Sequence, residues 1–332
     1  MLSSQPPQGN QASQSSPAPL PGADPRPADD GRVAAIVVNY NAARHLDACV
    51  LSIHANGVDD VIVIDNGSVD ESRQVALAAG ARWVPLADNL GYGRGANRGA
   101  ETPEGQSAAY LLICNPDTEL SDGSVAALVA SLCAEPDLGV VGPRVSNPDG
   151  SLYPSARTFP NLVDALGHGL LGLIAPRNRF TRRYRMLDWD HRRPARVDWV
   201  SGACFLARRE AWDAVGGFDP VYFMYMEDVD LCWRLARSGW GVGYQPGAEV
   251  VHVQGVSTNY HPYRMLAAHH SSMWKFASRT TEGAERAALP LVAAGLVARL
   301  VVATIRHFLG AAGSRLGSGG RSTGRRAPRP LP

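Results

Sequence analysis

The chain has very little lysine, and none of its cysteines forms a CxxC motif. Lys275 is the single lysine among 32 basic residues, so nearly every cation is an arginine. A net charge of +1 over 332 residues argues against a general nucleic-acid-binding protein, and we expect no nucleic-acid partner. The cysteines show neither CxxC pairs nor zinc-ligand spacing, which excludes a cysteine-rich zinc module and favours reduced core thiols of a cytosolic protein. They are Cys49, Cys114, Cys133, Cys204 and Cys232.

Large apolar residues are scarce before Val33. Residues 1–31 consist mainly of Pro, Ser, Gln, Ala and Gly. Such a segment buries too little apolar surface to offset the entropy of ordering, so we predict that it is disordered. It also lacks the apolar core of a secretory signal.

From Val33 the chain alternates between apolar strand patterns and helical patterns. This order predicts an α/β fold with a mostly parallel central sheet and helices on both faces. The predicted strands are 33–41, Val61–Ile64, Arg82–Leu86 and Tyr110–Cys114, and the predicted helices are Ala43–Ala55 and Asp70–Ala79.

Polar residues stand where three of these strands end, at Asn39, Asp65 and Asp117. Ligands of open α/β sheets bind at the carboxyl ends of the strands. Asp65 precedes the turn Asn66–Gly67–Ser68, and a carboxylate fixed there can accept an N–H from a pyrimidine base. The alternative is an Asx turn or a helix cap.

A glycine-rich segment, Asn89–Gly99, contains Arg94 and Arg98. Its permissive backbone and its cations suit a close approach to a diphosphate. However, the segment does not follow the first strand and matches no Walker motif, so the glycine pattern alone is a weak indicator.

Three carboxylates, Glu227, Asp228 and Asp230, lie behind an aromatic run and ahead of a helical pattern. Carboxylates this close repel one another, which raises the pKa of one of them and suits a general base. The alternative is that these acids favour a helix N-terminus, where the macrodipole attracts negative charge.

Two residues are candidates for a divalent cation site. Asp117 follows Asn115 and Pro116 at a strand end, and one or two carboxylates with substrate phosphates suffice for Mg²⁺ or Mn²⁺. His252 lies in a later strand pattern, Glu249–Val253, which could return beside Asp117. A structural histidine is the alternative.

Five motifs in this order resemble a family 2 glycosyltransferase with the GT-A fold, from about Val33 to about Ser257. They are 37–41 (Val-Val-Asn-Tyr-Asn), 65–68 (Asp-Asn-Gly-Ser), 115–117 (Asn-Pro-Asp), 199–203 (Trp-Val-Ser-Gly-Ala) and 227–230 (Glu-Asp-Val-Asp). Within the family the chain is most similar to bacterial rhamnosyltransferases of cell-wall assembly.

The resemblance implies a role for each matching position. Asp228 is the catalytic base, Asp65 holds the pyrimidine, and Asp117 binds the metal, with His252 completing that site. Asn115 stands where the family's metal-binding element has its first acid. Further substrate contacts are implied at Asn39, Asn41, Arg94, Asn97, Asn115, Trp199, Ser201, Gly202 and Glu227.

The resemblance also implies the substrates. The expected reaction is inverting transfer of rhamnose from dTDP-rhamnose to N-acetylglucosamine linked to a polyprenyl diphosphate, a step in making the arabinogalactan linker. Another inverting transferase of the family, for galactofuranose or glucose, is the main alternative. A non-catalytic nucleotide-binding scaffold and a sugar-nucleotide pyrophosphorylase are remote alternatives. The presence of Asp65, Asp117 and Asp228 together argues against the first. The second would need a basic glycine-rich loop directly after the first strand, where this chain has Asn39-Tyr40-Asn41-Ala42.

The C-terminal part is apolar but interrupted. Between Leu289 and Gly313 the only charges are Arg299 and Arg306, which lie on one helical face and suit a helix in the membrane interface rather than a spanning one. The tail adds five arginines that favour anionic lipid. A core helix is the alternative. We predict segments 1–31, 32–275 (the GT-A domain), 276–313 and 314–332, with peripheral binding to the cytoplasmic face of the plasma membrane.

One insertion has no clear function in the sequence. Residues 147–198 include Tyr153, Arg157, Phe159 and a basic-aromatic stretch, 177–193. Loops that contact the acceptor or lipid and a mobile solvated insertion are equally compatible with this composition.

Overall fold

A computed structural model describes residues 31–159, 178–179, 182, 186, 189–253 and 262–318, with residues 262 and 306–318 described by their backbone alone. Residues 1–30 of the predicted disordered segment, about half of the basic-aromatic stretch 177–193 and most of the tail 314–332 lie outside these residues.

The N-terminal half alternates strands and helices as predicted. Its elements are β1 (Val33–Asn39), α1 (Ala43–Ala55), β2 (Asp60–Asp65), α2 (Ser72–Ala78), β3 (Arg82–Pro85), α3 (Tyr92–Ala100), α4 (Pro103–Ser107) and β4 (Tyr110–Cys114). Strands β3, β2, β1 and β4 lie side by side and pair in parallel. The parallel pairing brings the carboxyl ends of β1, β2 and β4 to one edge.

The second half adds a mixed sheet and the helix that carries the acids. Strand β11 runs antiparallel between β4 and β6, and β12 lies parallel to β6. The elements are β5 (Thr118–Leu120), α5 (Ser124–Ala134), β6 (Leu138–Ser146), β7 (Leu152–Tyr153), β8 (Ala156–Arg157), β9 (Ala195–Val197), β10 (Trp199–Val200), β11 (Cys204–Arg208), α8 (Arg209–Val215), α9 (Glu227–Arg237) and β12 (Gly241–His252).

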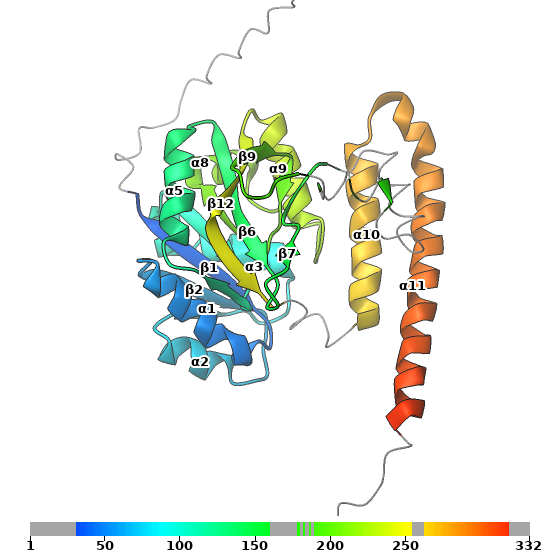
Figure 1. Ribbon diagram of the computed structural model, residues 1–332, viewed down its shortest axis with the longest axis horizontal. Helices are drawn as coiled ribbons and strands as arrows, with labels where there is room; N and C mark the ends of the chain where they lie inside the picture. Colours follow the sequence, from blue (N-terminus) through cyan, green and yellow to red (C-terminus); the bar gives the residue numbers. More distant parts are fainter. Residues whose placement is uncertain are drawn as a thin grey trace, which may run out of the picture. The chain divides into compact units, whose positions relative to one another are not determined.

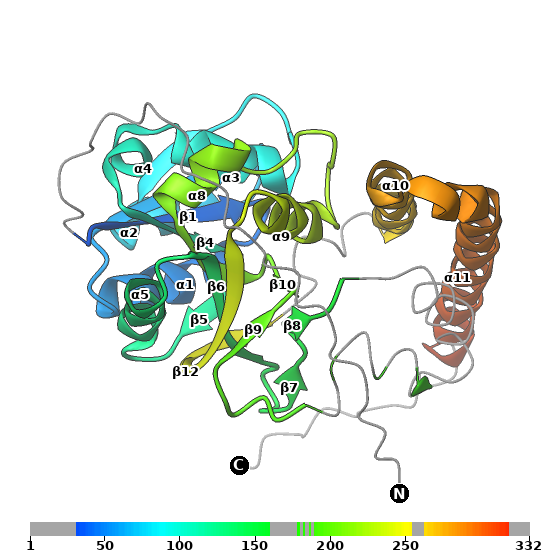
Figure 2. The same ribbon diagram turned by 90° about the horizontal axis from the view of Figure 1, so that it is seen from above.

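Helices cover both faces of the sheet (Figures 1 and 2). The side chains of β1 show the division, because Ile36 and Val38 pack with α3, α8 and α9, whereas Ala35 and Val37 pack with α1, α2 and α5. Strands buried on both faces explain the continuous apolar runs in the sequence. The predicted α/β fold is confirmed.

The glycines of α3 allow this helix to lie close to β1. A Cβ atom at Gly99 would stand 2.3 Å from Ile36 Cγ2, and one at Gly95 would stand 2.8 Å from Val38 Cγ1. These glycines therefore serve helix–strand packing, a role that the sequence pattern did not distinguish from phosphate binding.

Two long helices follow β12. Helix α10 (Pro262–Thr280) packs beside α11 (Leu289–Ser318), and a short 3₁₀ helix, Gly283–Ala288, joins them (Figures 1 and 2). Phe276 of α10 is buried in the core of the sheet domain. The predicted domain boundary after residue 275 thus falls within a helix that belongs partly to that core.

Helix α11 presents apolar side chains to the outside. The stretch Gly283–Ile305 is long and apolar enough to cross a membrane. The mean hydropathy of its most apolar window is 2.1, and none of the residues in that window is buried inside the protein. Leu291, Val297 and Ile305 are each more than half exposed. The alternative of a buried core helix is therefore wrong for these residues.

The thiols are free, as predicted, and all five lie in the described part of the chain. Four are buried, but Cys133 is exposed, which corrects the expectation of five core cysteines.

Candidate active site

A cavity of about 540 Å³ opens at the carboxyl edge of the parallel strands. Its wall comes from the ends of β1 and β4, from the segment 199–203, from the loop Phe223–Met226 and from the first turns of α9 and α10. Most of the predicted site residues line it, namely Asn115, Asp117, Trp199, Ser201, Gly202, Glu227, Asp228 and His252.

The three clustered acids have three different environments. Asp230 is buried, pairs with Arg234 at 2.7 Å and accepts a hydrogen bond from the hydroxyl of Tyr222. Glu227 and Asp228 line the cavity in the first turn of α9. Asp230 is therefore structural, and the other two acids are available for chemistry.

Asp228 is held by the backbone on both of its oxygens. Oδ2 accepts a 2.9 Å hydrogen bond from the N–H of Gly202, and Oδ1 accepts one of 2.9 Å from the N–H of Val229. Burial raises the pKa of Asp228 above its usual value, while these two N–H groups and the charge of Arg157 oppose the rise. The result is an oriented carboxylate at the cavity wall, as a general base requires.

Glu227 is more deeply enclosed than its neighbour. It is 6% exposed, and its Oε2 has no hydrogen-bond partner in the part of the chain that the structure describes. Burial, followed by the adjacent charge of Asp228, raises the pKa of Glu227 to about 8. At neutral pH, Glu227 is therefore largely a neutral acid beside Asp228.

Asp117, Asn115 and His252 converge at one point of the cavity. Strand β12 pairs with β5 so that His252 lies opposite Thr118, and the N–H of Val253 donates to the carbonyl of Asp117. His252 Nε2 lies 3.2 Å from Asp117 Oδ1 and 3.2 Å from Asn115 Nδ2. The predicted return of the His252 strand beside Asp117 is confirmed.

These residues offer few ligands for a metal ion. Within the described ranges, no group of three His, Cys, Asp or Glu side chains could hold an ion. Asp117 and His252 offer one oxygen and one nitrogen donor, and Asn115 offers an amide oxygen if its amide group turns over. Such a set fits a divalent cation whose other ligands come from a diphosphate.

Asp65 lies beside the cavity but does not line it. Its carboxylate accepts hydrogen bonds from Asn39 Nδ2 (3.0 Å), from the N–H of Ser68 (3.0 Å) and from the Ser68 hydroxyl. Asn41, from the loop after β1, contacts the segment that follows Asp65, where its Oδ1 accepts from the N–H of Val69. The Asx-turn alternative thus describes the contacts that the structure shows, and base recognition by Asp65 stays a prediction.

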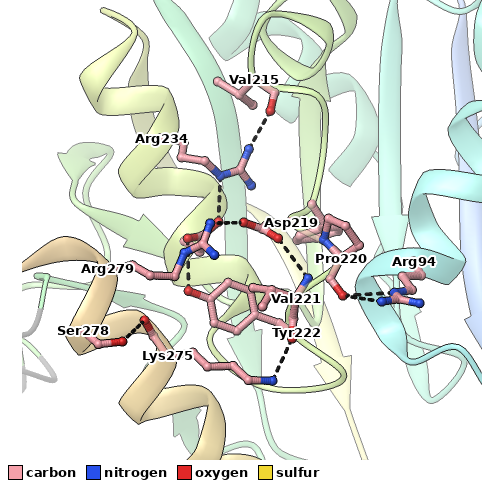
Figure 3. A network of polar contacts seen from close by, with 12 residues as sticks. Arg94, Val215, Asp219, Pro220, Val221, Tyr222, Arg234, Lys275, Ser278 and Arg279 are labelled. Atoms are coloured by element: carbon pink, nitrogen blue, oxygen red, sulfur yellow. Dashed lines mark hydrogen bonds and ion pairs between the residues drawn. The ribbon is translucent and has the colours of Figure 1, made fainter.

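Arg94 and Asn97 also have structural contacts in place of a cavity position. Arg94 donates through two nitrogens to the carbonyl of Pro220, at 3.0 and 2.9 Å (Figure 3). Asn97 makes a paired set of hydrogen bonds with the N–H and the carbonyl of Phe218. Helix α3 thereby holds the chain that leads into the loop 223–226.

The indole ring of Trp199 contacts the guanidinium of Arg157 at the cavity. Its ring lies under the guanidinium of Arg157, 4.9 Å from centroid to Cζ, and its Nε1 donates to the carbonyl of Thr158. Both side chains line the cavity together with Ser201. The basic group beside the acids is therefore Arg157 rather than Arg94 or Arg98.

Tyr92, Arg264 and Met265 are among the contributors to the cavity wall that sequence reasoning missed. Tyr92 donates from its hydroxyl to the carbonyl of Gly202 at 2.5 Å, which fixes the segment that binds Asp228. Arg264 and Met265 reach the cavity from α10. Tyr92 lies in the glycine-rich segment that was singled out for other reasons, whereas nothing in the sequence around residue 264 indicates a site.

Comparison with known proteins agrees with this geometry. Residues 30–273 match the family described as glycosyltransferase like family 2. Over 267 residues the chain is 39% identical to the N-acetylglucosaminyl-diphospho-decaprenol L-rhamnosyltransferase of Mycobacterium tuberculosis, an alignment that covers 76% of this chain and 86% of the relative. It is 24% identical over 227 residues to a low-salt glycan biosynthesis hexosyltransferase of Haloferax volcanii, with 67% of each chain covered.

A solved structure has the same fold. A mannosyltransferase from Pyrobaculum calidifontis, in complex with GDP-Man and Mn²⁺, superposes with a TM-score of 0.52 at 17% identity, over 86% of this chain and 80% of that one. With its GT-A sheet and its acids at the strand ends, the chain belongs to the family 2 glycosyltransferases.

Proposed function

We propose that the chain transfers rhamnose, with inversion, from dTDP-rhamnose to N-acetylglucosamine linked to a polyprenyl diphosphate. The observation that carries this proposal is the 39% identity to the mycobacterial rhamnosyltransferase, which extends across 76% of the chain. That alignment spans most of both chains, so the similarity is not confined to one short shared segment.

Asp228 acts as the base in this reaction. Its carboxylate takes the proton from an acceptor hydroxyl as the oxygen of that hydroxyl attacks the anomeric carbon. The new C–O bond forms on the face opposite the departing nucleoside diphosphate, whose bond to the sugar breaks with both electrons. A single displacement of this kind inverts the configuration, and the base is held in place by Gly202 and Val229.

Asp117 and His252, with Asn115 beside them, would hold Mg²⁺ or Mn²⁺ together with the donor diphosphate. A bound divalent cation neutralises the charge that builds up on the leaving group. The convergence of these side chains within 3.2 Å of His252 Nε2 supports the assignment.

In this proposal the enzyme is a peripheral protein of the cytoplasmic face of the plasma membrane and contacts the lipid through α11. The exposed apolar side chains of α11 support contact with lipid, and a lipid-linked acceptor gives that contact a purpose. Arg299 within the apolar stretch favours an interfacial position over a spanning one.

The test is transfer by the purified protein to membranes that supply N-acetylglucosaminyl-diphospho-polyprenol. The donors compared are dTDP-rhamnose, UDP-galactofuranose and UDP-glucose, each with and without Mg²⁺ or Mn²⁺, with Asp228→Asn as the inactive control. Rhamnose transfer is the expected result. Transfer from another donor alone would replace the substrate assignment, and nucleotide binding without transfer from any donor would support a non-catalytic scaffold.

A further inference from the structure

Arg264 is a cation at the rim of the cavity and has no acidic partner among the residues described. It lies in the first turn of α10, is exposed and lines the same cavity as Asp228. Its guanidinium carbon lies over the ring of Phe223, 5.4 Å from the centroid. A guanidinium over an aromatic face has its N–H groups in its own plane, pointing away from its centre, so they can still donate to an oxyanion.

The position of Arg264 relative to the cavity is fixed by the rest of α10. Lys275 donates to the carbonyl of Val221 at 2.8 Å, and Arg279 pairs with Asp219 at 2.6 Å (Figure 3). The hydroxyl of Ser272 donates to the carbonyl of Met224 at 2.9 Å. The rings of Tyr225 and His269 also meet edge to face at 5.0 Å. The helix is therefore attached along the loop that leads into Glu227 and Asp228.

The other side of α10 packs against α11, whose exposed face is apolar. Three features thus follow one another along the chain's surface: a carboxylate in the cavity, a cation at its rim and an apolar helix beyond it. A lipid-linked acceptor has its own parts in the same order, with a sugar hydroxyl, a diphosphate and a hydrocarbon chain.

We propose that Arg264 binds the diphosphate of the lipid-linked acceptor, with Met265 beside it contacting the first carbons of the isoprenoid chain. This inference rests on the proposed function. The reaction involves two diphosphates, one in the nucleotide-sugar donor and one in the lipid-linked acceptor. Asp117 and His252 lie at the carboxyl edge of the sheet, where we expect the donor diphosphate to bind. An arginine suits the second diphosphate, because its fork of donors matches phosphate oxygens in pairs.

The experiment measures equilibrium binding of farnesyl diphosphate, a prenyl diphosphate without a sugar, to the full-length protein. Arg264→Ala should weaken this binding at least about tenfold, which is the loss of one charge-assisted contact. Arg264→Lys should recover part of it. Arg286→Ala, which removes an exposed arginine of the same C-terminal region, is the matched control and should bind like the wild type. The affinity for dTDP should stay the same in all variants.

A transfer assay separates this inference from the proposed function. With an N-acetylglucosaminyl-diphospho-lipid, Arg264→Ala should raise KM and leave kcat nearly unchanged, whereas transfer to octyl N-acetylglucosaminide, which has no diphosphate, should not change. Absence of rhamnose transfer by the wild type would reject the proposed function, but farnesyl diphosphate binding that depends on Arg264 would still support the subsite. Farnesyl diphosphate binding that is absent, or equal in wild type and Arg264→Ala, would reject the subsite, as would an equal loss of dTDP binding.

Discussion

Lys275 on α10 donates a 2.8 Å hydrogen bond to the backbone carbonyl of Val221, shortly before the proposed base Asp228 in the chain. The loop between Val221 and Asp228 contains Tyr225 and Met226, both with a φ of 67°. A left-handed backbone at two successive residues other than glycine costs energy and persists only where its surroundings hold it. The only lysine of the chain is part of what holds this loop.

Replacing Lys275 with Met should therefore affect both stability and kinetics. The variant keeps the length of the side chain but leaves the Val221 carbonyl without its donor, at a cost of about 1–3 kcal/mol in the free energy of unfolding. Thermal unfolding measures that loss. If the lysine also positions the loop, the acceptor KM or kcat will change while the Kd for dTDP does not. Trp274→Ala, on an exposed position of the same helix, is the control, and a drop in Tm with wild-type kinetics would restrict Lys275 to stability.

Asp228→Asn should retain donor binding and lose turnover. The amide keeps the shape of the side chain but cannot accept the proton, and positioned bases contribute about 10²–10⁴ in rate. Steady-state transfer and dTDP titration measure the two effects separately. Near-normal turnover would remove Asp228 as the base.

Glu227 should make the stability of the protein depend on pH. Its pKa is about 8 in the folded chain and ordinary in the unfolded one, so the folded state binds the extra proton between these values. The free energy of unfolding should therefore fall as pH rises from about 4.5 to about 8, with a slope of up to about 1.4 kcal/mol per pH unit from this group. Urea unfolding at several pH values should show a shallower dependence for Glu227→Gln. Equal slopes for both proteins would contradict the proposed burial of a neutral acid.

Two single substitutions, Asp117→Asn and His252→Ala, should each weaken the affinity for the metal ion that supports transfer. The first removes the negative charge of one ligand and the second removes the other ligand, so a higher Mn²⁺ concentration should be needed for half-maximal rate. Binding of dTDP with and without Mn²⁺ provides a readout that does not depend on turnover. His54→Ala, a histidine of α1 outside the cavity, is the control, and identical Mn²⁺ requirements for all four proteins would exclude this cluster as the metal site.

The apolar face of α11 should mediate lipid binding. Changing Val297 and Val301, which are 63% and 51% exposed, to Asp should reduce cosedimentation with vesicles that contain anionic lipid. Leu77→Asp, at a similarly exposed position on α2, is the control for added negative charge. Unchanged cosedimentation of the double variant would move the membrane contact to another surface.

The fold was predictable because its signals are local. Continuous apolar runs identified β1, β2 and β4, and helix α1 occupies the predicted residues. The meeting of Asp117 with His252 was also predictable, since both stand at strand ends that one sheet edge must bring together.

The contribution of α10 was not predictable, because side chains that reach a site from a distant helix follow no sequence period. Arg94 and Arg264 illustrate the difficulty. The first stands in a conspicuous glycine-rich motif yet donates to a backbone carbonyl, whereas the second stands in an ordinary helical pattern yet lines the cavity. Only the packing of the chain assigns these two arginines to different tasks.

The attachment of α10 to the cavity loop has a consequence during synthesis on the ribosome. The parallel strands β1 to β4 are complete early in translation, but residues 264–279, which line and support the proposed acceptor side of the cavity, emerge much later. Domains form as their residues emerge, from the N-terminus onward. The nascent chain therefore completes its sheet before the acceptor side of its cavity, and its apolar helix α11 leaves the ribosome directly after that wall is finished.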